Sequence, residues 1–126
     1  MIALAWLAAA CNGGGDCVSD LDPDCTPAFT PTFEEIHRRT LTQSCAIAGA
    51  SCHATAGSQG GLALEDIDVA YRALVDDGRV IANDAACSLM VMRIEADDGT
   101  VMPPANPLRA AERCAIATWI REGAQR

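Results

Sequence analysis

Apolar residues recur at helical spacing in four stretches of this chain, and glycine, proline or aspartate separates each stretch from the next. The first stretch predicts a helix from Phe33 to Leu41 or a few residues beyond, because Phe33, Ile36 and Leu41 fall on or near one helical face. Thr32 and Glu35 have the spacing of a capping box. The folded domain is therefore expected to begin at Thr32.

Three further helices are predicted over about residues 65–75, 84–95 and 109–122, the second of them capped by Asp84. Aspartate–aspartate–glycine turns are expected to end the first two, and Gly123 is expected to follow the last. The positions expected to be buried are Ile67, Ala70, Tyr71, Leu74, Leu89, Met92 or Val91, Ile94, Ile116, Trp119 and Ile120. No convincing strand alternation is present, so the pattern predicts an all-α fold of about four helices.

The chain before the first helix has a different character. Ile2 to Ala10 is an apolar run that is too short to span a bilayer and has the length of a signal-peptide core. Leu7-Ala-Ala-Ala10-Cys11 resembles a bacterial lipobox, so we expect a signal peptide over residues 1–10 and a lipid on Cys11. The protein would then be lipid-anchored in the bacterial cell envelope, on its periplasmic or outer surface, without spanning the membrane.

Seven cysteines in 126 residues favour an oxidising compartment. Residues 11–31 are expected to form the lipidated cysteine, a glycine-rich tether and an acidic cysteine loop, and residues 32–126 the helical domain. With Cys11 lipidated, six cysteines remain, and 15 pairings of six are possible. Proximity along the chain favours Cys17 with Cys25, Cys45 with Cys52, and Cys87 with Cys114.

Charge and motif content exclude several classes of function. The formal net charge is −8 and the chain has no lysine, which argues against binding to nucleic acid or to anionic membranes. No nucleophile–base arrangement or paired-carboxylate motif can be recognised, so an enzyme is not expected.

Three motifs follow one another in a specific order: Cys52-His53, Met102-Pro103-Pro104 and a closing Trp119-Ile-x-x-Gly-Ala. Over about residues 32–124 this order resembles the small cytochrome c-like domains of planctomycete and myxobacterial envelope proteins. The resemblance implies haem c attached at Cys52, with His53 as the proximal iron ligand and Met102 as the distal one. Such a ligand pair suits electron transfer, and a redox or envelope protein that the sequence does not identify would be the partner.

The first cysteine of the attachment motif departs from the family's Cys-x-x-Cys-His pattern. Gly49 stands at its place, and six residues separate Cys45 from Cys52. That spacing is expected to put Cys45 in a different place relative to the haem ring. Either Cys52 forms a single thioether while Cys45 is free or paired elsewhere, or Cys45 and Cys52 form a disulfide. The second outcome implies a haem-free, disulfide-stabilised structural or protein-interaction lipoprotein on the same fold.

Overall fold

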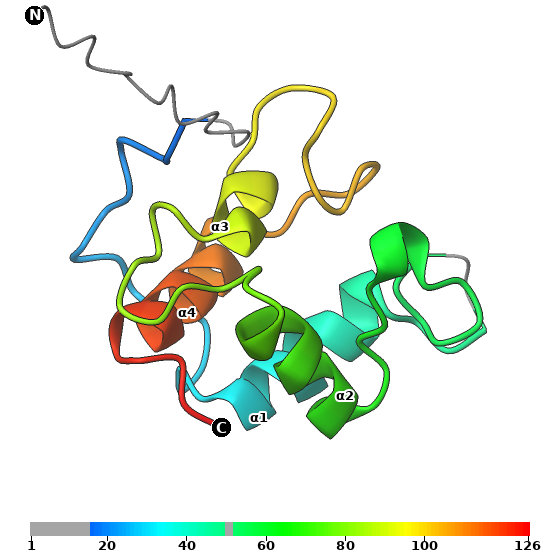
Figure 1. The fold of residues 1–126 in the computed structure, drawn as a ribbon. Helices are drawn as coiled ribbons and strands as arrows, with labels where there is room; N and C mark the ends of the chain where they lie inside the picture. Colours follow the sequence, from blue (N-terminus) through cyan, green and yellow to red (C-terminus); the bar gives the residue numbers. More distant parts are fainter. Residues whose placement is uncertain (1–15, 50–51) are drawn as a thin grey trace, which may run out of the picture.

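Helices make up the regular secondary structure of residues 16–49 and 52–126, which are the residues that the computed structural model describes, apart from one isolated bridge between Ile81 and Asp84 (Figure 1). The predicted all-α fold is confirmed. In chain order the elements are α1 (Phe33–Ile36), which continues directly into η1 (His37–Cys45), η2 (Gln59–Gly61), α2 (Ile67–Tyr71), which continues into η3 (Arg72–Asp76), α3 (Leu89–Ile94) and α4 (Ala110–Arg121). The predicted signal peptide and Cys11 lie outside the described residues.

Side-chain caps explain where the first two long helices begin. The Thr32 hydroxyl accepts the N–H of Glu35 at 3.3 Å, as the sequence predicts. Before α2, the Asp66 carboxylate accepts the N–H groups of Asp68 and Val69, both at 3.0 Å. This second helix therefore begins at Ile67, two residues later than predicted.

The helix predicted to start at Asp84 is wrong in its first half, because α3 begins only at Leu89. The buried hydroxyl of Ser88 accepts the N–H of Ile81 at 2.8 Å and donates to the carbonyl of Asp84 at 2.7 Å. Asp84 does cap the chain locally, but its carboxylate accepts the N–H of Cys87 within a turn. These side-chain bonds to the backbone stabilise a turn where periodicity alone predicted helix.

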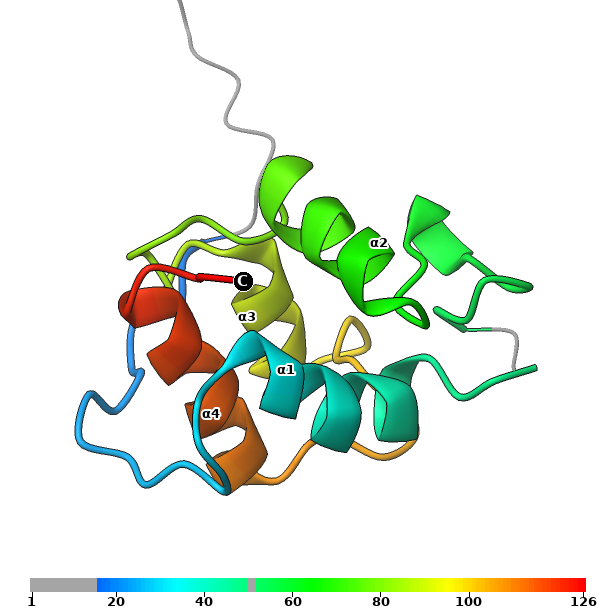
Figure 2. The same ribbon diagram turned by 90° about the horizontal axis from the view of Figure 1, so that it is seen from below.

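The core lies between α1, α2, α3 and α4 (Figure 2). Phe33 is 1% exposed, and its ring centroid lies 5.1 Å from that of Trp119 and 5.2 Å from that of Tyr71. Ile116 and Ile120 of α4 are fully buried beside this cluster. The last helix therefore packs against the first.

The chain ends against this core. The Tyr71 hydroxyl donates to the carbonyl of Ala124 at 2.8 Å, and the Trp119 indole N–H donates to the carbonyl of Gln125 at 2.8 Å. Gly123 follows the helix with a φ of +108°, a conformation that favours glycine at this position. The predicted end of α4 is confirmed.

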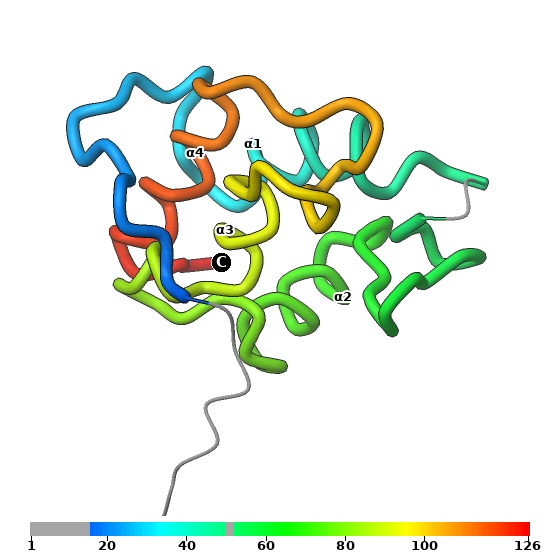
Figure 3. The backbone as a smooth tube through the Cα atoms, turned by 90° about the horizontal axis from the view of Figure 1, so that it is seen from above, coloured from blue at the N-terminus to red at the C-terminus, as the bar shows by residue number. Residues whose placement is uncertain are grey.

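Residues 16–31 run along the outside of α4 (Figure 3). Two disulfides fix this segment: Cys17 pairs with Cys87, and Cys25 pairs with Cys114. The predicted pairs Cys17–Cys25 and Cys87–Cys114 are therefore wrong. The reason is that the segment is extended and bonded along its length, with Val18 N–H donating to Ala86 at 3.0 Å and Ala28 N–H donating to Ala111 at 2.9 Å. We call residues 16–31 the N-terminal strap.

Two disulfides indicate an oxidising compartment. Across residues 16–49 and 52–126, no helix has the length and apolar character needed to cross a membrane.

Candidate functional site

An apolar cleft lies between the end of η1, the segment before α2 and the loop after α3. It consists of two adjoining cavities of about 370 and 410 Å³, sizes typical of small-molecule sites. His53, Met102 and Cys45 line both cavities, so these three residues occupy their shared middle. The aliphatic wall of the first cavity is formed by Leu41, Leu62, Leu64, Leu74, Leu89 and Ile94.

The His53 ring is oriented by the backbone on one side. Its Nδ1 lies 3.2 Å from the carbonyl oxygen of Leu62. Because a carbonyl only accepts, Nδ1 carries the proton and Nε2 keeps its lone pair. The carbonyl of His53 in turn accepts the N–H of Leu64 at 2.7 Å. An imidazole held this way is prepared to donate Nε2 to a metal.

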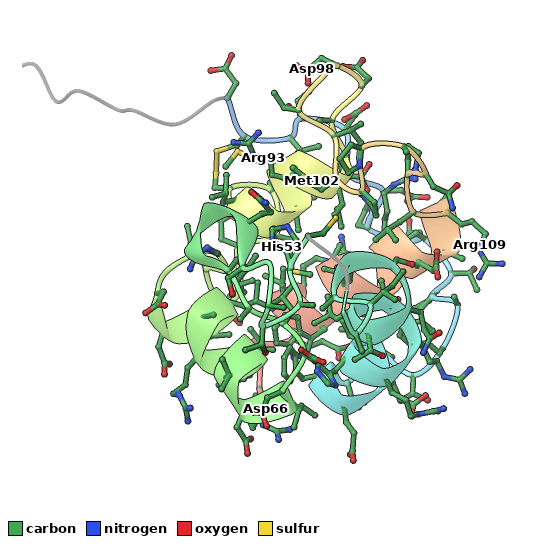
Figure 4. All side chains as sticks on the ribbon, turned by 90° about the vertical axis from the view of Figure 1, so that its right-hand side faces the viewer. His53, Asp66, Arg93, Asp98, Met102 and Arg109 are labelled. Atoms are coloured by element: carbon green, nitrogen blue, oxygen red, sulfur yellow. A yellow bond between two sulfur atoms is a disulfide. The ribbon has the colours of Figure 1, made fainter. Side chains whose placement is uncertain are left out.

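Met102 comes from the loop after α3, which is tied to the end of that helix. Its N–H donates to the carbonyl of Arg93 at 3.0 Å. The side chain is 36% exposed, so its thioether is accessible from the cleft. Pro104 follows on the wall of the second cavity. Figure 4 shows His53 and Met102 near each other on the face of the molecule that carries the cleft.

A backbone hydrogen bond joins the two ends of the segment between Cys45 and His53. Cys45 is the last residue of η1, and its carbonyl accepts the N–H of His53 at 3.1 Å. Within the loop, Gly49 has a φ of +78°, where a residue with a Cβ would be strained. Cysteine at position 49, as the standard motif requires, would therefore not suit this loop. Cys45 lies with His53 on the cleft wall, and its place relative to a haem ring stays a prediction.

Cys45 and Cys52 are both free thiols, so the disulfide predicted between them is not formed. Cys45 faces the cleft and is partly buried, whereas Cys52 is exposed at the rim of the second cavity. Burial raises the pKa of the Cys45 thiol to about 11, and the Glu112 carboxylate and the Cys52 thiol add to this effect. Cys45 is therefore a protonated thiol at neutral pH.

Several residues of the cleft were missed or misplaced by sequence reasoning. Leu89 was expected to be buried but is 42% exposed, because it lines the cleft instead of the core. Arg79 and Arg93 also line the cleft and were not singled out. Their sequence signal was weak, since arginine is common on protein surfaces. His37 does not line the cleft. Its Nε2 instead lies 3.0 Å from the carbonyl oxygen of Leu64 and 3.1 Å from that of Glu65.

The donors in the cleft fit a haem. An imidazole nitrogen and a thioether sulfur, the pair found in cytochromes c, line one apolar space together with two unpaired thiols. A site built from protein ligands alone is not indicated, since no group of three or more His, Cys, Asp or Glu in the described parts of the chain is arranged to hold a metal ion.

Comparison with known proteins gives one match. Residues 50–106 match the family described as Planctomycete cytochrome C. No curated protein and no solved structure matches the chain. The matched range includes both Cys52-His53 and Met102-Pro103-Pro104, and it supports a cytochrome c-like domain.

Proposed function

We propose that this protein is an electron-transfer protein of the bacterial cell envelope that binds haem c in the cleft, with His53 and Met102 as iron ligands. The observation that carries the proposal is the shared cleft: an imidazole with Nε2 available and a thioether line the same apolar space. When bound, a haem with this ligand pair supplies one-electron redox chemistry at a raised potential. The match to a cytochrome c family over residues 50–106 supports the same reading.

The protein's own residues have separable roles in this proposal. His53 would donate its Nε2 lone pair to the iron while its Nδ1–H donates a hydrogen bond to the Leu62 carbonyl, which fixes the plane of the ring. Met102 donates a soft thioether sulfur from a loop that the Arg93 carbonyl holds in place. The leucines and isoleucine of the wall exclude water from the cleft, which favours the less charged oxidation state.

Covalent attachment falls to the two thiols. The Cys52 thiol would hold the haem by adding across one vinyl group: a carbon–sulfur bond would form, the thiol hydrogen would go to the other vinyl carbon, and the carbon–carbon π bond would be lost. Cys45 lies in the same cleft and would be the donor for the second vinyl group by the same addition. No oxidant or reductant is consumed in either step. Both thiols must be reduced for this chemistry, and both are free.

The proposal places the protein at the membrane through a lipid on Cys11 and gives it a redox or envelope protein as partner. It assigns electron transfer and no enzymatic turnover, because the His53 imidazole and the Met102 thioether of the cleft are ligands for a cofactor. The oxidising compartment that the two disulfides indicate agrees with this location.

The direct test is expression of the full chain with a cytochrome c maturation system. We expect an intact mass increased by one haem that survives denaturation, and the reduced spectrum of a six-coordinate c-type haem. Met102→Leu should remove the iron–sulfur absorption band and keep the covalent mass, while Met92→Leu, outside the cleft, should keep both. A wild-type chain with both disulfides formed and no haem would overturn the proposal.

The haem-free structural lipoprotein is the alternative that this experiment separates. That alternative was predicted together with a Cys45–Cys52 disulfide, and these two residues are unpaired. A haem-free product whose mass shows Cys45 and Cys52 oxidised would favour the alternative. A haem-bearing product whose haem is released by Cys45→Ser plus Cys52→Ser would favour the electron carrier.

A further inference from the structure

The cleft has chemically different ends. Arg79 and Arg93 line only the first cavity, and Cys52 lines only the second. His53 and Met102 line both, so they lie between the guanidinium end and the thiol end. A ligand that fills both cavities therefore meets cations at one end and a thiol at the other.

The charge of the cleft opposes that of the chain. The protein has 17 acidic and 9 basic residues. Yet no aspartate or glutamate is among the described residues that line the two cavities, whereas two arginines are. An apolar wall with two guanidinium groups and no carboxylate suits an apolar ligand that carries carboxylates.

The two arginines are prepared for such a ligand in different ways. The Arg79 guanidinium donates to the carbonyls of Ala73 at 2.9 Å and Gly60 at 3.3 Å, and lies 3.7 Å from the Asp77 carboxylate. These contacts hold it at the cleft with donors to spare.

Arg93 has its donors available. Within residues 16–49 and 52–126 its guanidinium makes no hydrogen bond and no ion pair. The pKa of the nearby Asp98 carboxyl is lowered chiefly by hydrogen bonds from Thr100, and the charge of Arg93 makes a smaller contribution. Most other arginines of the chain, by contrast, pair with a carboxylate, as Arg113 does with Glu95 at 3.0 Å. Arg93 is also joined to the site through its carbonyl, which accepts the Met102 N–H. Figure 4 shows Arg93 close to Met102.

We propose that Arg79 and Arg93 bind the carboxylates of the cleft's ligand and thereby set its orientation, with the carboxylates at the guanidinium end and the reactive groups toward Cys52. The proposal rests on the proposed function for the identity of the ligand: haem carries its two propionates on the side of the ring away from its vinyl groups. Arg79 and Arg93 are thus positioning residues for attachment, because they would turn the vinyl side of the ring toward Cys52.

The test uses metal-free porphyrins, so that it does not depend on the iron ligands. The full chain, prepared without haem, is titrated with protoporphyrin IX and with its dimethyl ester, which has the same ring and vinyl groups and no carboxylates. We expect the diacid to bind about tenfold more tightly than the diester, as charge-assisted hydrogen bonds imply. Arg93→Gln should remove most of that preference, and Arg79→Gln should reduce it.

Arg72→Gln is the matched control, since Arg72 is an exposed arginine of η3 that does not line the cleft. It should keep the preference for the diacid. Arg79→Gln also removes backbone contacts, so Arg93→Gln, which removes none, decides the result if the former is destabilised. Equal binding of diacid and diester, or equal losses in Arg72→Gln and Arg93→Gln, would overturn the proposal.

The same variants, matured with haem, separate this proposal from the proposed function. Reduced covalent yield in Arg93→Gln with an unchanged yield in Arg72→Gln supports orientation by Arg93. Full haem attachment in the wild type together with no diacid preference overturns the role of the arginines and leaves the electron carrier standing. Absence of haem in the wild type overturns the proposed function itself.

Discussion

The two sides of this molecule use cysteine in opposite ways. On one side, the N-terminal strap is joined to the helical body by Cys17–Cys87 and Cys25–Cys114. On the other side, Cys45 and Cys52 remain thiols at a cleft. The four oxidised cysteines close long stretches of chain, whereas the two thiols are only a short loop apart. The comparison teaches that position in the fold, and not spacing in the sequence, decides which cysteines cross-link and which stay available.

The same two sides differ in how they pack. Phe33, Ile116 and Ile120 are 0–1% exposed and belong to a closed core. At the cleft, Leu89 is 42% and Met102 is 36% exposed. Exposed large apolar side chains that gather at a cavity indicate a surface that a ligand covers. The strap side is thus built for stability and the cleft side for binding, and four predictions test this division.

The largest effect should come from the strap. Cys25→Ser plus Cys114→Ser removes a cross-link between residues 89 apart in sequence, so the free energy of unfolding should fall by about 4 kcal/mol. Urea unfolding without reductant measures the change. Cleft binding of protoporphyrin IX, measured below the transition, should persist. If the folded variant no longer bound protoporphyrin IX, the strap disulfide would contribute to binding as well as to stability, and the proposed division between the two sides would be wrong.

The second effect comes from the Cys45 thiol in the haem-free protein. Its pKa is raised from an ordinary value of 9.0 to about 11, chiefly by burial, so the folded state holds this proton more tightly than the unfolded state. The stabilisation is fully present below pH 9 and is lost as the pH rises through 11. The difference between the two pKa values corresponds to a loss of at most about 2.7 kcal/mol in the free energy of unfolding.

Unfolding free energies at pH 8, 10 and 11 measure the titration of Cys45. Cys45→Ser should flatten the fall in stability above pH 9, and Cys52→Ser, at the exposed position, should not. Equal slopes in the wild type and Cys45→Ser would mean that the buried thiol contributes nothing to the pH dependence.

The third prediction separates the two histidines. His37→Ala removes contacts between Nε2 and two backbone carbonyls and should cost about 1 kcal/mol of stability. The haem spectrum of the matured protein should stay as in the wild type. His53→Ala should instead abolish the six-coordinate spectrum. A loss of that spectrum in His37→Ala at unchanged stability would contradict the assignment.

The smallest effect on stability is expected at the cleft rim. Cys52→Ser should change the free energy of unfolding by less than about 0.5 kcal/mol, because Cys52 is exposed. A brief pulse of iodoacetamide on the haem-free chain should label Cys52 before Cys45, since the raised pKa keeps Cys45 protonated. Peptide mass mapping identifies the labelled positions. Faster labelling of Cys45 would place it outside the cleft.

The sequence by itself determined the helices whose signals are local. Thr32 begins the first helix and Gly123 follows the last because caps and turn residues act on backbone groups a few residues away. The sequence also predicted that His53 and Met102 belong to one site, where they line the same cleft, but only through resemblance to a family. The start of α3 was not, since the buried Ser88 hydroxyl redirects the backbone before it.

Only the tertiary structure decided which cysteines form disulfides, which remain thiols, and which residues line the cleft. Cys17 pairs with Cys87 because the extended strap bonds to the chain beside Cys87, a contact that sequence proximity does not encode. Cys45 lies beside His53 because the loop between them closes on a backbone hydrogen bond and turns at Gly49. Arg79, in the bend after η3, and Arg93, on α3, come to line one cavity only when the chain is folded. Such long-range contacts depend on packing, and packing is a property of the whole chain.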